Sequence, residues 1–500
     1  MNYISLIYLF SLFCLAPRIT FAQSTNKSDW PVITRKGDQL YEGKKVFRFF
    51  GLAAPNIQQN ESQIKTDYSN RFPDEFEIRD IFGSIQRIGG RATRTFSLSV
   101  FSPADKGMPV YITQKRKYNE EAFRCLDKVI ALAHEYNVRL IIPFIASQSF
   151  GGIRGVDEFS TLSGKPNGAF WKDETVKADF KHLLYFILNR KNTVNGILYK
   201  NDPAILCWQL GNEFGSYAGD RKLNNNEWSP HILAWSLEMA AYIKKNDTKH
   251  LVMEAGGADR NVLINDPNID IISDHLYEYW NRKGGLPWEL SPIALASRAA
   301  CKGKKALIVD EFGLGSYENL HSLMKTIRDN DIVGGLMWSI RSHRRDGGWY
   351  YHNEGGTTVN SFHVPGFSTG YDYEESRLLD LIRKESYAIR GMNPVAQKKP
   401  FPKPVLIQNG LGLTWRGSTG ASGYTVERAE SEKGPWQVLA VGVEDAVIAN
   451  VVDFENTQRA NNPLVLFYDE TKTEKKSYYY RTKGVNASGE TDYSNILRIK

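Results

Sequence analysis

The sequence contains few cysteines, four in 500 residues. Removal of an apolar N-terminal segment would leave Cys125, Cys207 and Cys301. This odd number lacks the paired spacing of a disulfide framework or a zinc site. The fold must therefore rely on a hydrophobic core, and we expect Cys125 and Cys207, which lie in apolar contexts, to be buried.

The sequence also lacks an apolar run long enough to cross a membrane. Residues 4–16 are mostly apolar but too few to span a bilayer, and Thr20 and Ala22 supply the small residues that precede a cleavage site. We therefore predict a signal peptide over residues 1–22, cleaved near Ala22, and a secreted, periplasmic or cell-surface protein without membrane insertion. An uncleaved N-terminal anchor is the alternative.

A strong positive charge is absent as well. The net charge is +7, and the densest basic run, Lys115–Lys117, lies in a polar stretch. No basic stripe alternates with aromatic residues, which argues against nucleic acid as a partner. Aromatic residues make up 12% of the chain. They fit either a large core or sugar-binding surfaces, and composition alone does not separate these possibilities.

The length favours two or three domains. Residues 392–404, MNPVAQKKPFPKP, are rich in proline and lysine and predict a stiff linker. We place the main domain at residues 30–391 and a smaller one at residues 405–500.

Strand-like apolar runs alternate with helical patterns in the main domain. Most runs are continuously apolar, as in a parallel sheet buried on both faces. Eight such runs predict a (β/α)8 barrel. They are Phe47–Ala53, Thr93–Val100, Arg139–Ala146, Ile205–Leu210, His250–Glu254, Ile269–Ser273, Ala306–Asp310 and Val333–Trp338. A doubly wound open sheet is the alternative, but no glycine-rich phosphate loop follows the first run.

Residues 405–500 have a different pattern, with short strands separated by turn residues. This pattern predicts a small immunoglobulin-like β-sandwich that resembles a fibronectin type III module. We expect Trp415 and Tyr480 to anchor its core. It shows no convergent polar cluster, so we assign it a spacer or docking role.

Two of the eight apolar runs stand out, because one leads into Gly211-Asn212-Glu213 and the other into Asp310-Glu311. Because the carboxyl ends of barrel strands meet at one rim, Glu213 and Glu311 should lie close together. Two carboxylates at a cleft are the minimum needed to cleave a glycosidic bond: one donates a proton and the other acts as nucleophile or base.

Residues 189–213, NRKNTVNGILYKNDPAILCWQLGNE, are the most specific stretch. Over about residues 45–390 the chain resembles glycoside hydrolase family 5 of the retaining clan A, and within it the plant-type endo-β-1,4-mannanases. The resemblance implies that Glu213 is the acid/base and Glu311 the nucleophile, and it implies no metal and no cofactor.

The resemblance also implies five substrate-binding or supporting residues: Arg94, Asn212, His275, Tyr277 and Trp338. Arg94 would keep Glu311 ionised, Tyr277 would orient Glu311, and His275 would support Glu213 or bind a sugar hydroxyl. Asn212 would bind the 2-hydroxyl group, and Trp338 would form the floor under the sugar ring. Arg91 is an alternative to Arg94.

The chain departs from the mannanase pattern at two places. Phe214-Gly215 follows Glu213, where mannanases usually carry Pro-Arg, and residues 341–373 form a long insertion. We expect the insertion to close one end of the cleft, with Trp349 and Tyr350 as candidate sugar contacts. Its histidines, His343 and His352, fit a polar loop better than a metal site.

These observations predict a monomeric retaining mannan endo-1,4-β-mannosidase that acts on β-mannan or manno-oligosaccharides. An exo-acting β-mannosidase or a β-1,4-glucanase of the same family is the first alternative. A non-catalytic carbohydrate-binding or adhesion protein is the second.

Overall fold

The computed structural model describes residues 30–60, 71–104, 108–148, 154–217, 225–278, 289–351, 353–354, 358–359, 361–367, 374–410, 412–446, 465–473 and 476–499. The predicted signal peptide and His352 lie outside these ranges. Within the described parts, no helix combines the length and apolarity needed to cross a membrane.

Eight parallel strands form the centre of the main domain, in the order β4-β13-β12-β11-β10-β9-β8-β5. They are β4 (Phe49–Leu52), β5 (Ala92–Arg94), β8 (Arg139–Pro143), β9 (Ile205–Gln209), β10 (Leu251–Met253), β11 (Ile271–Tyr277), β12 (Ala306–Gly313) and β13 (Gly334–Met337). The end strands meet where the N–H of Ala54 donates to the carbonyl oxygen of Arg94 at 2.8 Å, so the barrel is nearly closed. The predicted (β/α)8 barrel is confirmed.

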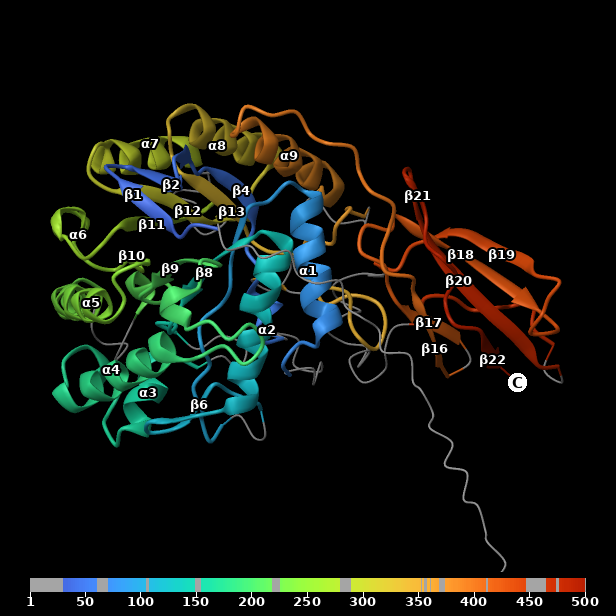
Figure 1. Ribbon diagram of the computed structural model, residues 1–500, viewed down its shortest axis with the longest axis horizontal. Helices are drawn as coiled ribbons and strands as arrows, with labels where there is room; N and C mark the ends of the chain where they lie inside the picture. Colours follow the sequence, from blue (N-terminus) through green and yellow to red (C-terminus); the bar gives the residue numbers. More distant parts are fainter. Residues whose placement is uncertain are drawn as a thin grey trace, which may run out of the picture. The chain divides into compact units, whose positions relative to one another are not determined.

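Helices surround these strands (Figure 1). They are α1 (Glu75–Arg87), α2 (Glu120–Tyr136), α3 (Val156–Leu162), α4 (Glu174–Asn189), α5 (Asn225–Asn246), α6 (Arg260–Asn265), α7 (Leu290–Cys301), α8 (Tyr317–Asp329) and α9 (Glu375–Ala388). Local sequence fixes several helix starts. In α1, the side chains of Asp74 and Glu77 form a reciprocal capping box. Apolar residues at helical spacing, such as Ile78, Ile81 and Ile85, then face the barrel.

An N-terminal β-meander packs on the barrel, an element that the sequence analysis missed. Strands β1 (Ile33–Lys36), β2 (Gln39–Glu42) and β3 (Lys45–Val46) form a three-stranded antiparallel sheet. Ile33 and Leu40 belong to the same buried cluster as barrel residues from β9 to β13. The meander is therefore part of the barrel core. Gly37 and Gly43, both at φ 62°, make its turns and were the available signal.

Residues 189–213 carry the strongest family resemblance, and the first part of this segment has a structural role. The buried carboxylate of Asp127 on α2 accepts hydrogen bonds from Arg190 Nη2, Thr193 Oγ1 and Tyr199 Oη, each at 2.7 Å. This network fixes the turn between α4 and the 3-10 helix η3 (Tyr199–Asn201), from which the chain enters β9. The network thereby fixes the start of the strand that ends at Glu213.

The C-terminal part forms antiparallel sheets. Strands β16 (Val405–Asn409) and β17 (Gly412–Arg416) pair with each other. A second sheet contains β18 (Gly423–Ala429), β19 (Gln437–Val443), β20 (Tyr478–Asn486), β21 (Gly489–Glu490) and β22 (Leu497–Ile499). Trp415 and Tyr480 are 0% and 1% exposed in the shared core, as expected for its anchors.

Buried polar bonds connect this part to the barrel. The Asp80 side chain on α1 accepts a hydrogen bond from Thr419 Oγ1 at 2.6 Å. His343 lies between two carboxylates, with Nδ1 3.0 Å from Asp80 Oδ2 and Nε2 3.1 Å from Asp445 Oδ2. Burial lowers the pKa of His343, but Asp80 and Asp445 outweigh it and raise the pKa to about 9. Protonated His343 thus bridges residues on both sides of the predicted linker.

The Asp127 network predicts a large effect on stability. The Asp127→Ala variant would leave the Arg190 cation without its buried partner, which should lower the free energy of unfolding by about 3–5 kcal/mol. Denaturant-induced unfolding would measure it. Asp380→Ala is the control, because Asp380 is exposed and 3.5 Å from Lys384; it should change stability by less than about 0.5 kcal/mol. Equal stability of the two variants would contradict the structural role of Asp127.

Candidate active site

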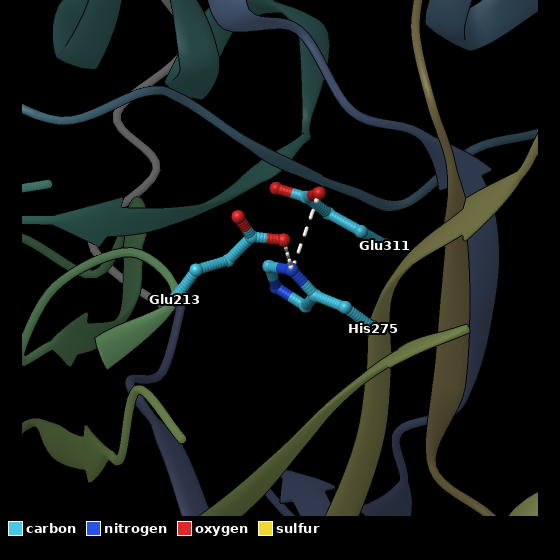
Figure 2. A group of neighbouring side chains, drawn as sticks. All are labelled: Glu213, His275 and Glu311. Atoms are coloured by element: carbon cyan, nitrogen blue, oxygen red, sulfur yellow. Dashed lines mark hydrogen bonds and ion pairs between the residues drawn. The ribbon is translucent and has the colours of Figure 1, made fainter. Parts of the chain in front are cut away.

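Glu213 and Glu311 lie at the carboxyl ends of β9 and β12 and face each other (Figure 2). One carboxylate oxygen of each and a ring nitrogen of His275 all lie within 4.8 Å of one another. The Glu213 side chain is 27% exposed and the Glu311 side chain 5% exposed. The strands therefore bring together the two acids that the sequence analysis selected, one accessible and one nearly enclosed.

His275 lies between the two carboxylates (Figure 2). Its Nδ1 is 2.9 Å from Glu213 Oε1 and 3.3 Å from Glu311 Oε2. Burial lowers the pKa of His275, but the surrounding carboxylates, Glu311 first, raise it well above its usual range. The imidazolium form thus supplies a proton that both glutamates can share. His275 contacts both carboxylates directly, an arrangement that fits proton sharing better than metal coordination.

Arg94 points from the end of β5 into this cluster and is fully buried. Its Nη1 donates to Glu311 Oε1 at 2.6 Å and its Nη2 to Asn212 Oδ1 at 2.7 Å. Its Nε donates to Gln209 Oε1 at 2.7 Å. Arg91, the alternative, forms an ion pair with Glu42 at 2.8 Å instead. Arg94 is therefore the arginine that contacts Glu311.

Tyr277, at the end of β11, donates its hydroxyl to Glu311 Oε2 at 2.6 Å. Even so, burial raises the pKa of Glu311 to about 7, although His275, Arg94 and this hydrogen bond act to lower it. We expected Arg94 to keep Glu311 ionised. The sign of its effect is as expected, but desolvation is larger, so the net shift is upward.

Asn212 and Trp338 complete the predicted set. The amide oxygen of Asn212 accepts the bond from Arg94, so its amide nitrogen is the donor available for a ligand. Trp338 follows β13, is 5% exposed, and packs against Phe96 with ring centroids 5.8 Å apart. Because β13 pairs with β12, the strand that carries Glu311, Trp338 is placed to form the floor of a small site.

The backbone conformation at Glu213 is unusual. It explains why Phe214 follows Glu213, where mannanases usually carry proline. Glu213 has φ 52° and ψ 50°, a left-handed conformation that is rare outside glycine. Phe214 then points into an aromatic cluster, with ring centroids 4.8 Å from Trp171 and 5.4 Å from Trp235. A Cβ on Gly211 would lie 2.3 Å from the Phe214 ring. Gly211 and Phe214 thus fit together to turn Glu213 toward the site.

An irregularity in β12 lets two neighbouring acids face the barrel interior. Between Ile308 and Glu311, β12 advances three residues while β11 advances two, from Ser273 to His275. The register with β13 shifts in the same region. In a regular strand, neighbouring side chains point to opposite faces. Because one extra residue is inserted, both Asp310 and Glu311 contact Arg94, with Asp310 Oδ2 3.2 Å from its Nε.

The sequence analysis missed three buried residues of this cluster: Gln209, Ser273 and Asp310. Gln209 Nε2 donates to Asp310 Oδ2 at 2.8 Å, and Ser273 Oγ donates to Asp310 Oδ1 at 2.5 Å. A signal was present, because Gln209 and Ser273 are polar residues in otherwise apolar runs. Such residues at strand ends need partners when buried.

The insertion after β13 corrects another expectation. Trp349 and Tyr350, the candidate sugar contacts, are 1% and 2% exposed. Trp349 Nε1 donates to Asp445 Oδ1 at 2.9 Å, and the Tyr350 hydroxyl donates to Glu77 Oε1 at 3.0 Å. Their aromatic surfaces are used in packing, so neither is placed to stack on a sugar.

Comparison with known proteins places this geometry in a family context. Residues 141–331 match the family model described as GH family 5 beta-mannosidase-like. That segment is similar to this family, and the match covers less than half of the chain. It contains both glutamates, Asn212, His275 and Tyr277, whereas Arg94 and Trp338 lie outside the matched range.

The curated relatives include plant enzymes. Mannan endo-1,4-beta-mannosidase 2 of Arabidopsis thaliana is 26% identical over 290 residues, which cover 50% of this chain and 62% of that protein. Mannan endo-1,4-beta-mannosidase 7 of the same plant is 32% identical over 184 residues, which cover 36% of this chain and 40% of that protein. The chain thus spans less than two thirds of these relatives.

Among solved structures, the endo-beta-1,4-mannanase of Thermotoga petrophila shares the fold. It aligns with a TM-score of 0.54 and 16% identity, over 92% of this chain and 98% of that chain.

The burial of Trp349 leads to a prediction about stability. Replacement by alanine should lower the free energy of unfolding by about 3–5 kcal/mol, because a large buried ring and a hydrogen bond are lost. Denaturant-induced unfolding measures this change. Tyr185→Ala is the control, since Tyr185 is 54% exposed; it should stay within about 0.5 kcal/mol of the wild type. An unchanged stability of Trp349→Ala would return this ring to the candidate ligand contacts.

Proposed function

We propose that this chain is a retaining glycoside hydrolase that cleaves β-1,4-mannosidic bonds. The observation that carries the proposal is the approach of Glu213 and Glu311, with carboxylate oxygens within 4.8 Å. Retaining enzymes hold their two carboxyl groups about 5–5.5 Å apart, whereas inverting enzymes need ~6.5–9.5 Å to admit a water molecule. The short separation favours direct attack by one carboxylate.

The surroundings of Glu311 and Glu213 indicate which catalytic role each side chain takes. Glu311 is nearly enclosed and held at both oxygens by Arg94 and Tyr277, so it is the nucleophile that attacks the anomeric carbon. Glu213 is more exposed and bonded to His275, so it protonates the departing glycosidic oxygen. A covalent glycosyl-enzyme forms. Glu213 then removes a proton from water, which attacks the anomeric carbon and releases Glu311.

The other residues support this exchange. The proton shared by His275 can stabilise Glu213 after it has given its own proton to the leaving group. The amide nitrogen of Asn212 is placed to donate to the sugar 2-hydroxyl, a contact that strengthens as the ring flattens in the transition state. Trp338 provides an apolar surface for the same ring.

The choice of mannan rests on the family match and on the plant relatives, whose names describe mannan endo-1,4-beta-mannosidases. We propose endo action on β-mannan by a monomer. Digestion of mannohexaose tests this choice: mixed oligosaccharides support endo action, whereas mannose alone would identify an exo-acting β-mannosidase. Faster turnover of cellulose than of mannan would instead identify a β-1,4-glucanase.

The two glutamates provide the first test of the mechanism. Glu213→Gln should lower kcat on mannan by about 10²–10⁴-fold, the usual contribution of general acid–base catalysis. Glu311→Gln should lower it at least as far, because no covalent intermediate can form. Reducing-sugar release measures both.

Glu278→Gln is the matched control for these two variants. Glu278 directly follows β11, but its Oε2 accepts bonds from the Ser316 N–H and from Asn319 Nδ2 at the start of α8. It should keep near wild-type activity. Ordinary activity of Glu311→Gln would end the assignment, and so would a first product of inverted anomeric configuration, seen by proton NMR.

The pKa of Glu311 predicts the acidic limb of the pH profile. Only the ionised carboxylate attacks, and burial raises its pKa to about 7. The reactive fraction therefore decreases as pH falls below about 7, and kcat/KM should drop about tenfold per pH unit there. Initial rates at low substrate concentration measure this limb. A value of kcat/KM that stays constant down to pH 5 would contradict the effect of burial.

Three further assignments complete the proposal. Residues 405–500 form a fibronectin type III-like module that follows a linker at residues 392–404, and the antiparallel sheets support this assignment. The module serves as a docking element for the barrel, consistent with the bonds at Asp80 and Asp445. The apolar residues 4–16 act as part of a signal peptide, which directs the enzyme out of the cytoplasm.

A further inference from the structure

Asp310 is a buried carboxylate next to the proposed nucleophile, and the mechanism above gives it no step. Its side chain is 0% exposed. A carboxylate at such a position is costly unless charges and hydrogen bonds compensate it. Its retention beside Glu311 therefore calls for an explanation from its contacts.

The contacts of Asp310 come from three other strands of the barrel, β5, β9 and β11. Oδ1 accepts the Ser273 hydroxyl at 2.5 Å. Oδ2 accepts Gln209 Nε2 at 2.8 Å and lies 3.2 Å from Arg94 Nε. The same oxygen is 3.4 Å from His275 Nε2. Both oxygens are thus directed at groups that surround the site.

The same cationic groups hold the two glutamates from their other sides. Arg94 turns Nε toward Asp310 and Nη1 toward Glu311. His275 turns Nε2 toward Asp310 and Nδ1 toward Glu213. Gln209 connects the two sets, because its Oε1 accepts from Arg94 and its Nε2 donates to Asp310.

The charges around Asp310 are matched to an ionised carboxylate. Burial alone would raise the pKa of Asp310, but His275, Arg94 and the Ser273 hydroxyl together hold it below its usual range. Asp310 therefore offers a permanent negative charge to the faces of Arg94 and His275 that point away from the glutamates.

We propose that Asp310 is a positioning residue that fixes the orientation of Arg94 and His275, and through them the orientation of Glu311 and Glu213. The proposal rests on the proposed function, because it assigns Asp310 a role in the same reaction. It predicts that loss of the Asp310 charge changes kcat and the protonation of His275 rather than the affinity for substrate.

The Asp310→Asn variant tests the proposal with little change in shape. Its amide can keep one acceptor oxygen, but it places an N–H2 group against the donors of Gln209 or Ser273. Misplacement of Arg94 and His275 should lower kcat on mannan about 10²-fold, with KM changed by less than about twofold.

The pH dependence separates positioning from a general loss of structure. Glu213 and Glu311 face Nδ1 of His275, and Asp310 faces its Nε2. Arg94 and Tyr277 influence His275 through their contacts with Glu311. Removal of the Asp310 charge should lower the pH at which His275 titrates. Nitrogen NMR of the imidazole, assigned with a His275→Gln variant, reads this midpoint without any substrate.

Asp270→Asn is the matched control. Asp270 is also a buried acid of the barrel, but it accepts from Arg35 Nε at 3.2 Å and from the Val252 N–H at 2.9 Å, outside this cluster. This variant should keep the wild-type kcat and His275 midpoint. Thermal unfolding of both variants shows whether each is folded at the assay temperature.

The outcomes are distinct. A wild-type kcat and His275 midpoint in Asp310→Asn would overturn the proposal, and so would equal changes in Asp270→Asn. If the wild-type enzyme does not hydrolyse mannan, the proposed function fails. The NMR midpoints still decide whether Asp310 controls His275.

Discussion

The geometry of this site depends on the buried guanidinium group of Arg94. A buried cation is tolerated only when acceptors surround it. Here the acceptors are Gln209, Asn212 and Glu311, which come from the ends of β9 and β12 while Arg94 comes from β5. One side chain thus joins three strands across the barrel, and the closed fold is what brings these groups together. Because a guanidinium group is planar and directional, it orients Glu311 and Asn212 as well as attracting them.

The site balances desolvation against positive charge. Burial favours the neutral form of Glu311, whereas Arg94, His275 and the Tyr277 hydroxyl favour the carboxylate. The result is a carboxylate whose protonation is decided near neutral pH. Glu213 is more accessible to solvent and shares His275 with Glu311. The different surroundings of two chemically identical side chains are the basis of the different roles proposed for them.

The sequence carried much of this arrangement. All eight barrel strands overlap the predicted apolar runs, because continuous burial on two faces leaves a clear pattern. The acids at the ends of β9 and β12 follow from the rule that strand ends share one rim. The turns of the N-terminal meander are short and its strands are only partly apolar, so it was missed. The burial of Trp349 and Tyr350 could not be predicted, because it depends on Asp445 and Glu77, which are distant in sequence.

The extra residue in β12 has a consequence for comparing related chains. A strand alignment that assumes strict alternation would assign Asp310 to the helix-facing layer and would treat it as an ordinary structural acid. A relative that lacked the additional residue would direct only one of the two neighbouring acids inward. Such a relative could keep the proposed nucleophile while losing the anionic support behind Arg94 and His275. In this barrel, the extra residue of β12 therefore decides whether one acid or two face the interior.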